Sequence, residues 1–193
     1  RRFAKEHNTR YEDLDLIMCH LGGGISLAVH KHGRAIDANN ALTGEGPFSP
    51  ERSGTLPVGP LIDLCYSGKY THEQMIQYVT SKSGLLAHLG TNDVATVVKR
   101  IEDGDKHAEL VLNAMIYQIA KSIGGLAPVL YGKVDAIILT GGIAYSEYVI
   151  KRLTERIEFI APVYVYAGED ELTALAMNAL SAMRGELPIK VYK

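Results

Sequence analysis

The sequence predicts an α/β fold, and three observations support this prediction. Short apolar segments with a period of two fill much of residues 14–38, which is typical of strands. Residues 106–130 carry apolar side chains every three or four positions, as a helix packed on a core does. In the last third of the chain, short β-branched segments alternate with helical ones, which is the order of parallel β-α-β units.

The first three expected strands are short and joined by glycine-containing turns. The second strand has Ile25, Leu27 and Val29 on one side, so one of its faces is expected to be buried. Short connections join antiparallel neighbours, which predicts a three-stranded meander. The three segments are residues 14–20, 25–30 and 34–38.

A long loop and a series of helices follow. Residues 39–60 are rich in Gly, Pro, Ser and Asn without any period, and loops above about 12–15 residues in a compact domain are usually functional or disordered. Pro128 is expected to bend or end the longest helix. The helical patterns are residues 61–65, 72–80, 93–101 and 106–130, with a turn region at 81–92.

The last third is expected to add two strands, at 134–139 and 163–166, each followed by a helix. Ser146 can cap the first helix, three acidic residues at 169–171 open the second, and Gly185 closes it. The apolar side chains of this final helix are expected to face the core. They are Leu172, Leu175, Ala176, Ala179, Leu180 and Met183.

Composition excludes several classes of function. The 20 Lys and Arg against 22 Asp and Glu give a formal net charge of −2, which leaves no electrostatic footprint for nucleic acid. The longest apolar runs fall far short of the roughly 20 residues of a membrane span. Cys19 and Cys65 cannot build a disulfide framework, so a reducing compartment is expected. With no signal peptide visible, the sequence predicts a soluble, cytoplasmic protein.

The opening of the chain predicts a piece of a longer protein. There is no initiating methionine, and residues 1–10 have the pattern of the end of a helix already under way. We therefore expect residues 1–13 to be the end of a preceding helix or linker and residues 14–193 to form one domain.

Two glycine turns are the candidate binding elements. Gly22-Gly23-Gly24 between two strands suits either a tight turn or a phosphate held by successive backbone N–H groups. It matches neither the dinucleotide-binding fingerprint nor the P-loop. Gly141-Gly142 follows a buried strand and precedes a helix, the place where open α/β sheets bind ligands, although a simple strand-to-helix turn has the same pattern.

Three segments together carry a resemblance to a known family. They are His20-Leu-Gly-Gly-Gly-Ile-Ser, Asn39-Asn-Ala-Leu-Thr-Gly-Glu-Gly-Pro-Phe-Ser-Pro-Glu-Arg-Ser-Gly-Thr-Leu-Pro and Leu139-Thr-Gly-Gly-Ile-Ala. They resemble the butyrate kinase branch of the acetate kinase family, within the superfamily of sugar kinases, heat-shock chaperone ATPases and actin. The resemblance runs over essentially the whole chain but covers only the C-terminal half of such an enzyme. It implies a ribonuclease-H-like (actin-like ATPase) domain, a mixed five-stranded sheet with helices on both faces, and an absent N-terminal domain.

The resemblance also implies an activity. Such an enzyme transfers the γ-phosphoryl group of ATP to a short or branched fatty acid, giving an acyl phosphate and ADP, and uses Mg²⁺. Arg52 would be the catalytic arginine, whose permanently charged fork suits phosphoryl oxygens; the alternative is a surface arginine paired with Glu51. The phosphate-binding turn would be His20, Leu21, Gly22, Gly23 and Gly24.

The adenosine and metal sites are likewise implied by resemblance. One acidic residue of the final helix, Glu171, would be the metal-linked carboxylate, although acids at a helix start are expected for dipole reasons alone. The family usually has an arginine two residues after Asp93, where this chain has Ala95, and Asp93 can also cap a helix. The adenosine-binding residues would be Asn92, Asp93, Gly141, Gly142, Ile143 and Ala144.

Several alternatives remain open at this point. An acetate kinase-like enzyme is the second candidate, and the chain alone is expected to be an inactive nucleotide-binding fragment. A relative that has lost its nucleotide is favoured only by Ala95. The expected partners are a nucleotide, a small carboxylate, the N-terminal domain and a further copy of the protein in a homo-oligomer, with neither nucleic acid nor membrane.

Overall fold

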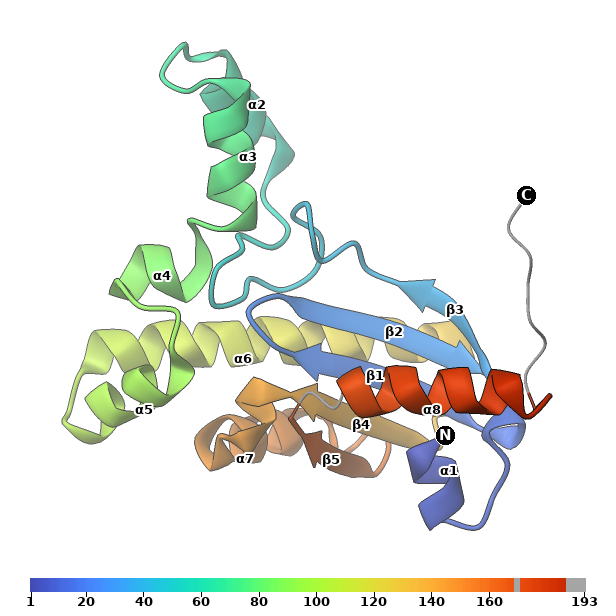
Figure 1. The fold of residues 1–193 in the computed structure, drawn as a ribbon. Coiled ribbons are helices and arrows are strands. Elements are labelled where there is room, and N and C mark those ends of the chain that lie inside the picture. The colour runs from blue at the N-terminus through green and yellow to red at the C-terminus, as the bar shows by residue number, and fades with distance from the viewer. Residues whose placement is uncertain (169–170, 187–193) are drawn as a thin grey trace.

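The computed structural model describes residues 1–168 and 171–186, and its centre is a five-stranded mixed sheet (Figure 1). The strand order is β3-β2-β1-β4-β5. β1, β2 and β3 pair antiparallel, whereas β4 is parallel to both β1 and β5, which confirms the predicted mixed sheet. The strands are β1 (Asp15–Leu21), β2 (Ile25–Lys31), β3 (Arg34–Ala38), β4 (Ala136–Gly141) and β5 (Val163–Ala167).

Along the central strands, successive side chains point alternately to the two faces of the sheet. In β1, Ile17, Cys19 and Leu21 belong to the larger core cluster, while Leu16 belongs to a smaller cluster on the other face. β4 divides in the same way, because Ala136 and Ile138 belong to the smaller cluster, whereas Ile137 and Leu139 belong to the larger. A period of two in a strand buried on both sides accounts for this division.

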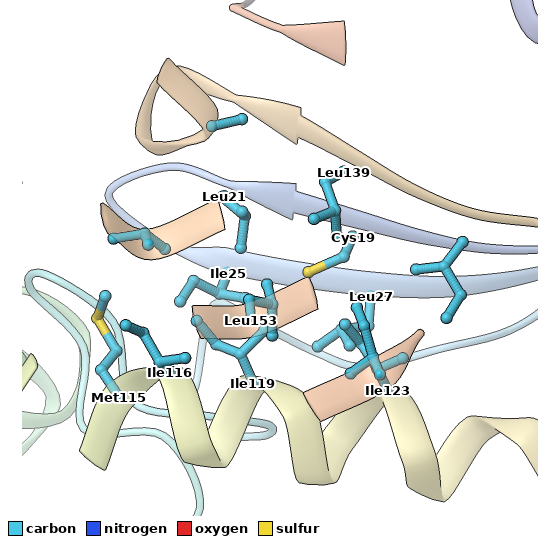
Figure 2. Close-up of a cluster of buried hydrophobic side chains, with 14 of the residues drawn as sticks. Cys19, Leu21, Ile25, Leu27, Met115, Ile116, Ile119, Ile123, Leu139 and Leu153 are labelled. Atoms are coloured by element: carbon cyan, nitrogen blue, oxygen red, sulfur yellow. The ribbon is translucent and has the colours of Figure 1, made fainter. Parts of the chain in front are cut away.

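Three helices cover the first face: α5 (Val94–Glu102), α6 (Lys106–Leu126) and α7 (Glu147–Ile157). Figure 2 shows side chains of α6, among them Ile116, Ile119 and Ile123, directed at the side chains of β1 and β2. The short helix η2 (Ala127–Leu130) contains Pro128 and continues α6 as a 3₁₀ turn, so the predicted end of the long helix is confirmed.

Residues 106–130 also form the one helix, among the residues described, that is long and apolar enough to cross a membrane. The core helix of a soluble protein passes the same test of length and composition. Here the apolar positions of α6 pack on the sheet, which is the reason for their spacing.

The second face is covered near the N-terminus. α1 (Arg2–Glu6) buries Phe3 and Ala4 beside Ala136 and Ile138, and the ring of Phe3 lies 4.8 Å from that of Tyr164. The short helix η1 (Tyr11–Asp13) then leads into β1. Helices therefore lie on both faces of the sheet, as predicted.

The two helices that follow β3 in the sequence form an arm that projects from the molecule (Figure 1). We call residues 58–80, which contain α2 (Val58–Tyr66) and α3 (His72–Thr80), the arm. α2 buries none of its residues and α3 buries only Met75. Within the part of the chain that is described, the apolar side chains of α2 are therefore open to solvent; Tyr66, for example, is 88% exposed.

Two sequence predictions about helices were wrong. The expected turn region at 81–92 contains α4 (Gly84–Leu89), a helix too short for periodicity to reveal. α8 (Glu171–Met183) forms, but its predicted inward face is exposed: Leu172 and Met183 are each 84% exposed. An amphipathic pattern shows that a helix has an apolar side, but it does not identify what covers that side.

Candidate functional site

A cleft of about 860 Å³ opens at the carboxyl ends of β1 and β4. Parallel strands end at the same edge of a sheet, so the turns that follow them meet there. The cleft unites three segments that are far apart in the sequence: the first glycine turn, the start of α5 and the turn after β4. Its lining residues include Gly22, Gly23, Asn92, Asp93, Gly142 and Ile143.

The first glycine turn is closed by its own backbone, because Gly22 N donates to Gly24 O at 3.1 Å. Gly23 is exposed on the cleft wall, whereas Gly22 is buried. A turn without side chains lets a ligand approach the backbone closely, as a bound phosphate requires.

The two glycines at the end of β4 and just after it, Gly141 and Gly142, serve different purposes. Gly141 has φ +91, and a Cβ there would collide with the backbone of Leu21 in the neighbouring strand. Gly142, the first residue of η3 (Gly142–Tyr145), has open space where a Cβ would stand and faces the cleft. Gly141 therefore permits the two strand ends to approach, and Gly142 leaves room for a ligand.

Asp93 caps the helix whose start forms one wall of the cleft. Its carboxylate accepts from the backbone N–H groups of Ala95 and Thr96, at 3.3 and 3.0 Å. Hydrogen bonds from Thr96, first from its hydroxyl and then from its backbone, lower the pKa of Asp93 below its usual value. Ala95 is exposed and lines the cleft, so the position where the family usually has an arginine does face the site.

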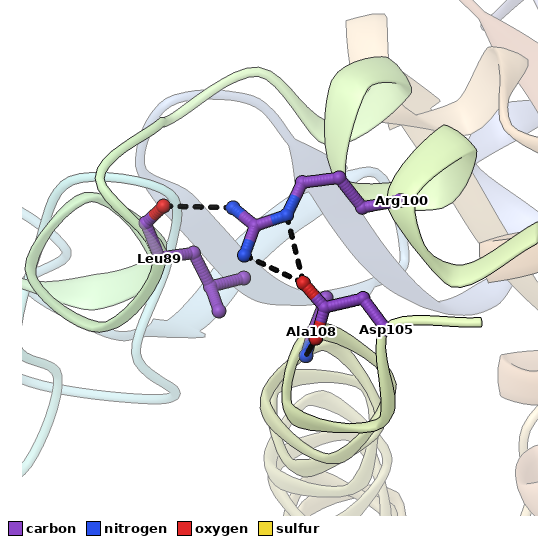
Figure 3. A network of polar contacts seen from close by, with 4 residues as sticks. All are labelled: Leu89, Arg100, Asp105 and Ala108. Atoms are coloured by element: carbon purple, nitrogen blue, oxygen red, sulfur yellow. Dashed lines mark hydrogen bonds and ion pairs between the residues drawn. The ribbon is translucent and has the colours of Figure 1, made fainter. Parts of the chain in front are cut away.

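A network behind this wall holds α5 in place (Figure 3). The guanidinium of Arg100 donates to Asp105 Oδ2 from Nε and Nη2, at 3.0 and 2.7 Å, and from Nη1 to Leu89 O at 2.8 Å. Asp105 also caps α6 by accepting from Ala108 N at 2.9 Å. The network thus links α4, the last turn of α5 and the start of α6.

Ser49 fastens the long loop to the glycine turn. Its hydroxyl donates to Gly23 O at 2.6 Å and accepts from Arg52 N at 3.1 Å. At 1% exposed, Ser49 is the one fully buried polar residue in the described part of the chain. The sequence analysis missed Ser49, and no periodic signal marks it; only its place in the long loop could have indicated it.

Arg52 lies on the other side of the same turn. A Cβ on Gly24 would collide with its guanidinium, and Arg52 Nη1 donates to Ala41 O at 2.7 Å. Its side chain forms no ion pair with Glu51 within the described residues. Arg52 therefore borders the glycine turn without lining the cleft of Gly23 and Gly142.

Glu51 lines the cleft, and the sequence analysis did not select it as a site residue. Its Oε1 accepts from Asn92 Nδ2 at 2.5 Å, and its Oε2 lies 3.7 Å from the position that a Cβ on Gly23 would occupy. This bond connects the long loop to the residue before Asp93 across one end of the cleft.

The remaining predicted site residues lie outside the cleft. His20 Nδ1 is 3.1 Å from Thr140 Oγ1, and the side chains of Leu21 and Ala144 are buried in the larger core cluster. A Cβ at Gly24 or at Gly141 would collide with protein atoms, as described above. Glu171 begins α8, but its side chain lies outside the described part of the structure, as do residues 169 and 170.

The described residues contain no group of three or more His, Cys, Asp or Glu that could hold a metal by themselves. A Mg²⁺ site needs fewer protein ligands, because Mg²⁺ takes one or two carboxylates and completes its coordination shell with water and substrate phosphates. The carboxylate of Glu51, which lines the cleft beside Gly23, fits this requirement.

The mixed sheet, with glycine turns after both central parallel strands and a cleft between them, defines a ribonuclease-H-like domain of the actin-like ATPase class. Acetate kinase from Porphyromonas gingivalis has this fold, with a TM-score of 0.82 and 24% identity over 93% of this chain and 52% of that one. The enzyme from Entamoeba histolytica gives a TM-score of 0.78 and 22% identity, over 92% and 54%. The acetokinase family model matches residues 1–166, and the chain belongs to that family.

Two curated relatives extend over the whole chain. A probable butyrate kinase from Bacteroides thetaiotaomicron is 66% identical over 193 residues, which are 100% of this chain and 55% of the relative. A probable butyrate kinase from Phocaeicola vulgatus is 52% identical over the same 193 residues, 54% of its length. The chain therefore spans about half the length of the curated relatives it matches.

Proposed function

We propose that this chain is the nucleotide-binding part of an ATP-dependent carboxylate kinase. The enzyme would transfer the γ-phosphoryl group of ATP to butyrate, or to a similar short or branched fatty acid, to give an acyl phosphate and ADP. The cleft carries the proposal, because it unites segments that resemble phosphate-binding and adenosine-binding elements. The 66% identical relative, a probable butyrate kinase, supports the choice of acid.

The residues would divide the work of phosphoryl transfer. The transition state is loose and anionic, so catalysis consists of positioning and of stabilising negative charge. The backbone N–H group of Gly23 would hold the phosphates, since that of Gly22 is bonded to Gly24 O within the turn, and Gly142 and Ile143 would lie against the adenosine. Arg52, beside Gly24, would stabilise the transferring group. Mg²⁺, when bound, would neutralise phosphate charge; Glu51 is placed to hold it, and the resemblance adds Glu171.

The wider setting is proposed on the same basis. The acyl pocket would be shared with an N-terminal domain outside this chain, so the chain alone would bind nucleotide without turning over. The protein would act in the cytoplasm. An acetate kinase-like activity is the second candidate, and a panel of carboxylates from acetate to branched acids separates the two.

We also propose that the protein self-associates through the arm. A specific interface buries about 800 Å² per partner and is richest in aromatic and large apolar side chains. The arm and Leu56, two residues before it, expose such side chains, and we propose that a second copy covers them. They are Leu56, Val58, Ile62, Leu64, Tyr66, Ile76 and Tyr78. Sedimentation should show a dimer or larger species that Ile62→Asp with Tyr66→Asp dissociates; a monomeric full-length protein would contradict this proposal.

The nucleotide site is tested by Gly142→Val. A Cβ at Gly142 meets no protein atom and points into the cleft, so valine would occupy ligand space without straining the fold. We expect calorimetric titration to show ADP binding lost by at least a hundredfold. Gly59→Val on the arm, where a Cβ also meets no atom, should bind ADP normally. Unchanged affinity in Gly142→Val would contradict the adenosine assignment.

A further inference from the structure

Glu51 brings an unpaired negative charge to the wall of the proposed nucleotide cleft. Its Oε2 faces Gly23, and its Oε1 accepts from a neutral amide, Asn92 Nδ2, at 2.5 Å. Within residues 1–168 and 171–186, no ion pair involves Glu51. The carboxylate is therefore partnered but not neutralised.

The backbone of Glu51 is held by hydrogen bonds on both sides, which places the residue beside the glycine turn. Glu51 N donates to Ser49 Oγ at 3.4 Å, and Glu51 O accepts from Ser83 N at 2.9 Å. Leu86 N donates to Pro50 O at 2.9 Å, which ties the residue before Glu51 to α4. The side chain is held by Asn92 across the cleft.

Among the described residues, no other charge of the cleft forms an ion pair with this carboxylate. Lys99 is the one basic side chain among the lining residues, and it lies on α5 five residues beyond Val94 at the helix start. Arg52 lies beside the next glycine, Gly24, and its Nη1 donates to Ala41 O. The titratable and charged side chains that line the cleft are Glu51, Asp93, Lys99, Glu102, Glu147, Tyr145 and Tyr148.

A phosphate at Gly23 would thus meet a like charge. Like charges within a few ångströms repel strongly where water is partly excluded, so free ADP should bind poorly at this turn. The repulsion becomes attraction when the phosphates carry a divalent cation, because Mg²⁺ is held by one or two carboxylates together with substrate phosphates.

We propose that Glu51 makes the cleft selective for metal-complexed nucleotide over free nucleotide. This inference rests on the proposed nucleotide-binding function and adds a role for a residue outside the glycine turns. Glu51 rejects uncomplexed phosphate groups and accepts those that carry Mg²⁺. A carboxylate therefore stands at the phosphate turn where P-loops have a lysine.

The test compares ADP affinity with Mg²⁺ and with EDTA by calorimetry of the full-length protein. Wild type should prefer MgADP by at least tenfold. In Glu51→Gln, which keeps an oxygen for Asn92 Nδ2, metal-free ADP should bind about three- to tenfold more tightly and MgADP more weakly. The ratio of the MgADP affinity to the metal-free ADP affinity should then fall toward one. Mn²⁺ titration followed by electron paramagnetic resonance should show a weaker ternary complex in the same variant.

Two further variants control for charge and for folding. Glu155→Gln removes one negative charge from an exposed position of α7 outside the cleft, and it should keep the wild-type preference. Glu51→Asp keeps the carboxylate and should retain most of the preference, even if Glu51→Gln folds poorly. If well-folded Glu51→Gln kept the wild-type preference for MgADP, or if Glu155→Gln lost it, this inference would be overturned while the proposed function would stand. Wild-type protein that binds ADP under neither condition would contradict the proposed function as well.

Discussion

Ser49 shows how a single hydroxyl can hold a site together. It is buried, it donates to the carbonyl of Gly23, and it accepts from the backbone of Arg52. The proposed phosphate turn and the proposed catalytic arginine are thus joined through one side chain. Removal of this buried hydroxyl would leave Gly23 O and Arg52 N without their hydrogen-bond partner.

We predict that Ser49→Ala destabilises the protein by about 1–3 kcal/mol, because Gly23 O and Arg52 N lose their partner. Chemical denaturation measures the change. Ser49→Thr should recover part of the loss by restoring the hydroxyl. Ser26→Ala, at an exposed position of β2, should be nearly neutral. Equal stability of Ser49→Ala and Ser26→Ala would contradict the bridging role.

Arg52 is predicted to affect turnover far more than nucleotide affinity. It borders the glycine turn but does not line the cleft, so ADP contacts should survive its removal. In the full-length enzyme, Arg52→Ala should lower kcat by about a thousandfold, the order seen for cationic groups that stabilise a transferring phosphoryl. Arg52→Lys should recover little, because an ammonium lacks the planar fork. A matching loss of ADP affinity in calorimetry would refute the phosphoryl role.

At the residue scale, the sequence identified the glycines of the turns better than the side chains that contact them. Gly22, Gly23 and Gly142 were expected near a ligand because two glycine turns follow strands and resemble those of a known family, and all three line the cleft. Ser49 and Glu51 could not be predicted, because they lie in a loop without periodicity, and their partners, Gly23 and Asn92, are distant in sequence.

At the scale of elements, side-chain caps begin helices both beside the cleft and in the arm. Ser146, predicted as the cap of α7, accepts from Val149 N at 3.4 Å, and Thr71 makes a capping box with Gln74 in α3. α4 escaped prediction because its first residue is Gly84, which has φ +61. A Cβ there would collide with the carbonyl of Ser49, so the glycine permits a close approach that only the fold reveals.

The Arg100–Asp105 network leads to a prediction about pH. Hydrogen bonding from Ala108 N, followed by that from Arg100, lowers the pKa of Asp105 below its usual 3.8. A carboxyl group with a depressed folded-state pKa stabilises the fold above its unfolded value and loses that contribution as pH falls through the folded value. The midpoint of thermal unfolding should therefore drop as the pH is lowered from 5 to 3.

Asp105→Asn tests this link directly. The variant should melt below wild type at pH 6, and the difference between the two should shrink as the pH falls below 3.8 toward the folded-state pKa, because the stabilising contribution of the charge declines over that range. Asp103→Asn, an exposed neighbour beyond the end of α5, is the matched control and should follow wild type throughout. A constant difference between Asp105→Asn and wild type from pH 6 to pH 3 would exclude the titration of Asp105 as the cause.

At the scale of the whole molecule, topology was predictable where strand patterns were strong. The meander, the two later strands and the long helix have clear periods, and a mixed sheet follows from their order. The outward faces of the arm and of α8 were not predictable, because apolar periodicity indicates burial without identifying the partner. Both faces are exposed here, in a chain that covers about half of its relatives.

The glycine turns and the start of α5 line one cleft within this chain, and this leads to a prediction about the chain by itself. A ligand that binds only the folded state stabilises it by RT ln(1 + [L]/Kd), about 2.7 kcal/mol at a hundred times Kd. For a chain of this size, that amounts to roughly 5–10 °C in Tm. We therefore expect MgADP to raise the Tm of the 193-residue chain by this amount, with one-site saturation, while butyrate phosphorylation stays absent. Gly142→Val should show no such rise. A folded chain whose Tm ignores MgADP, beside a full-length protein that responds, would mean that the other half of the enzyme completes the nucleotide site.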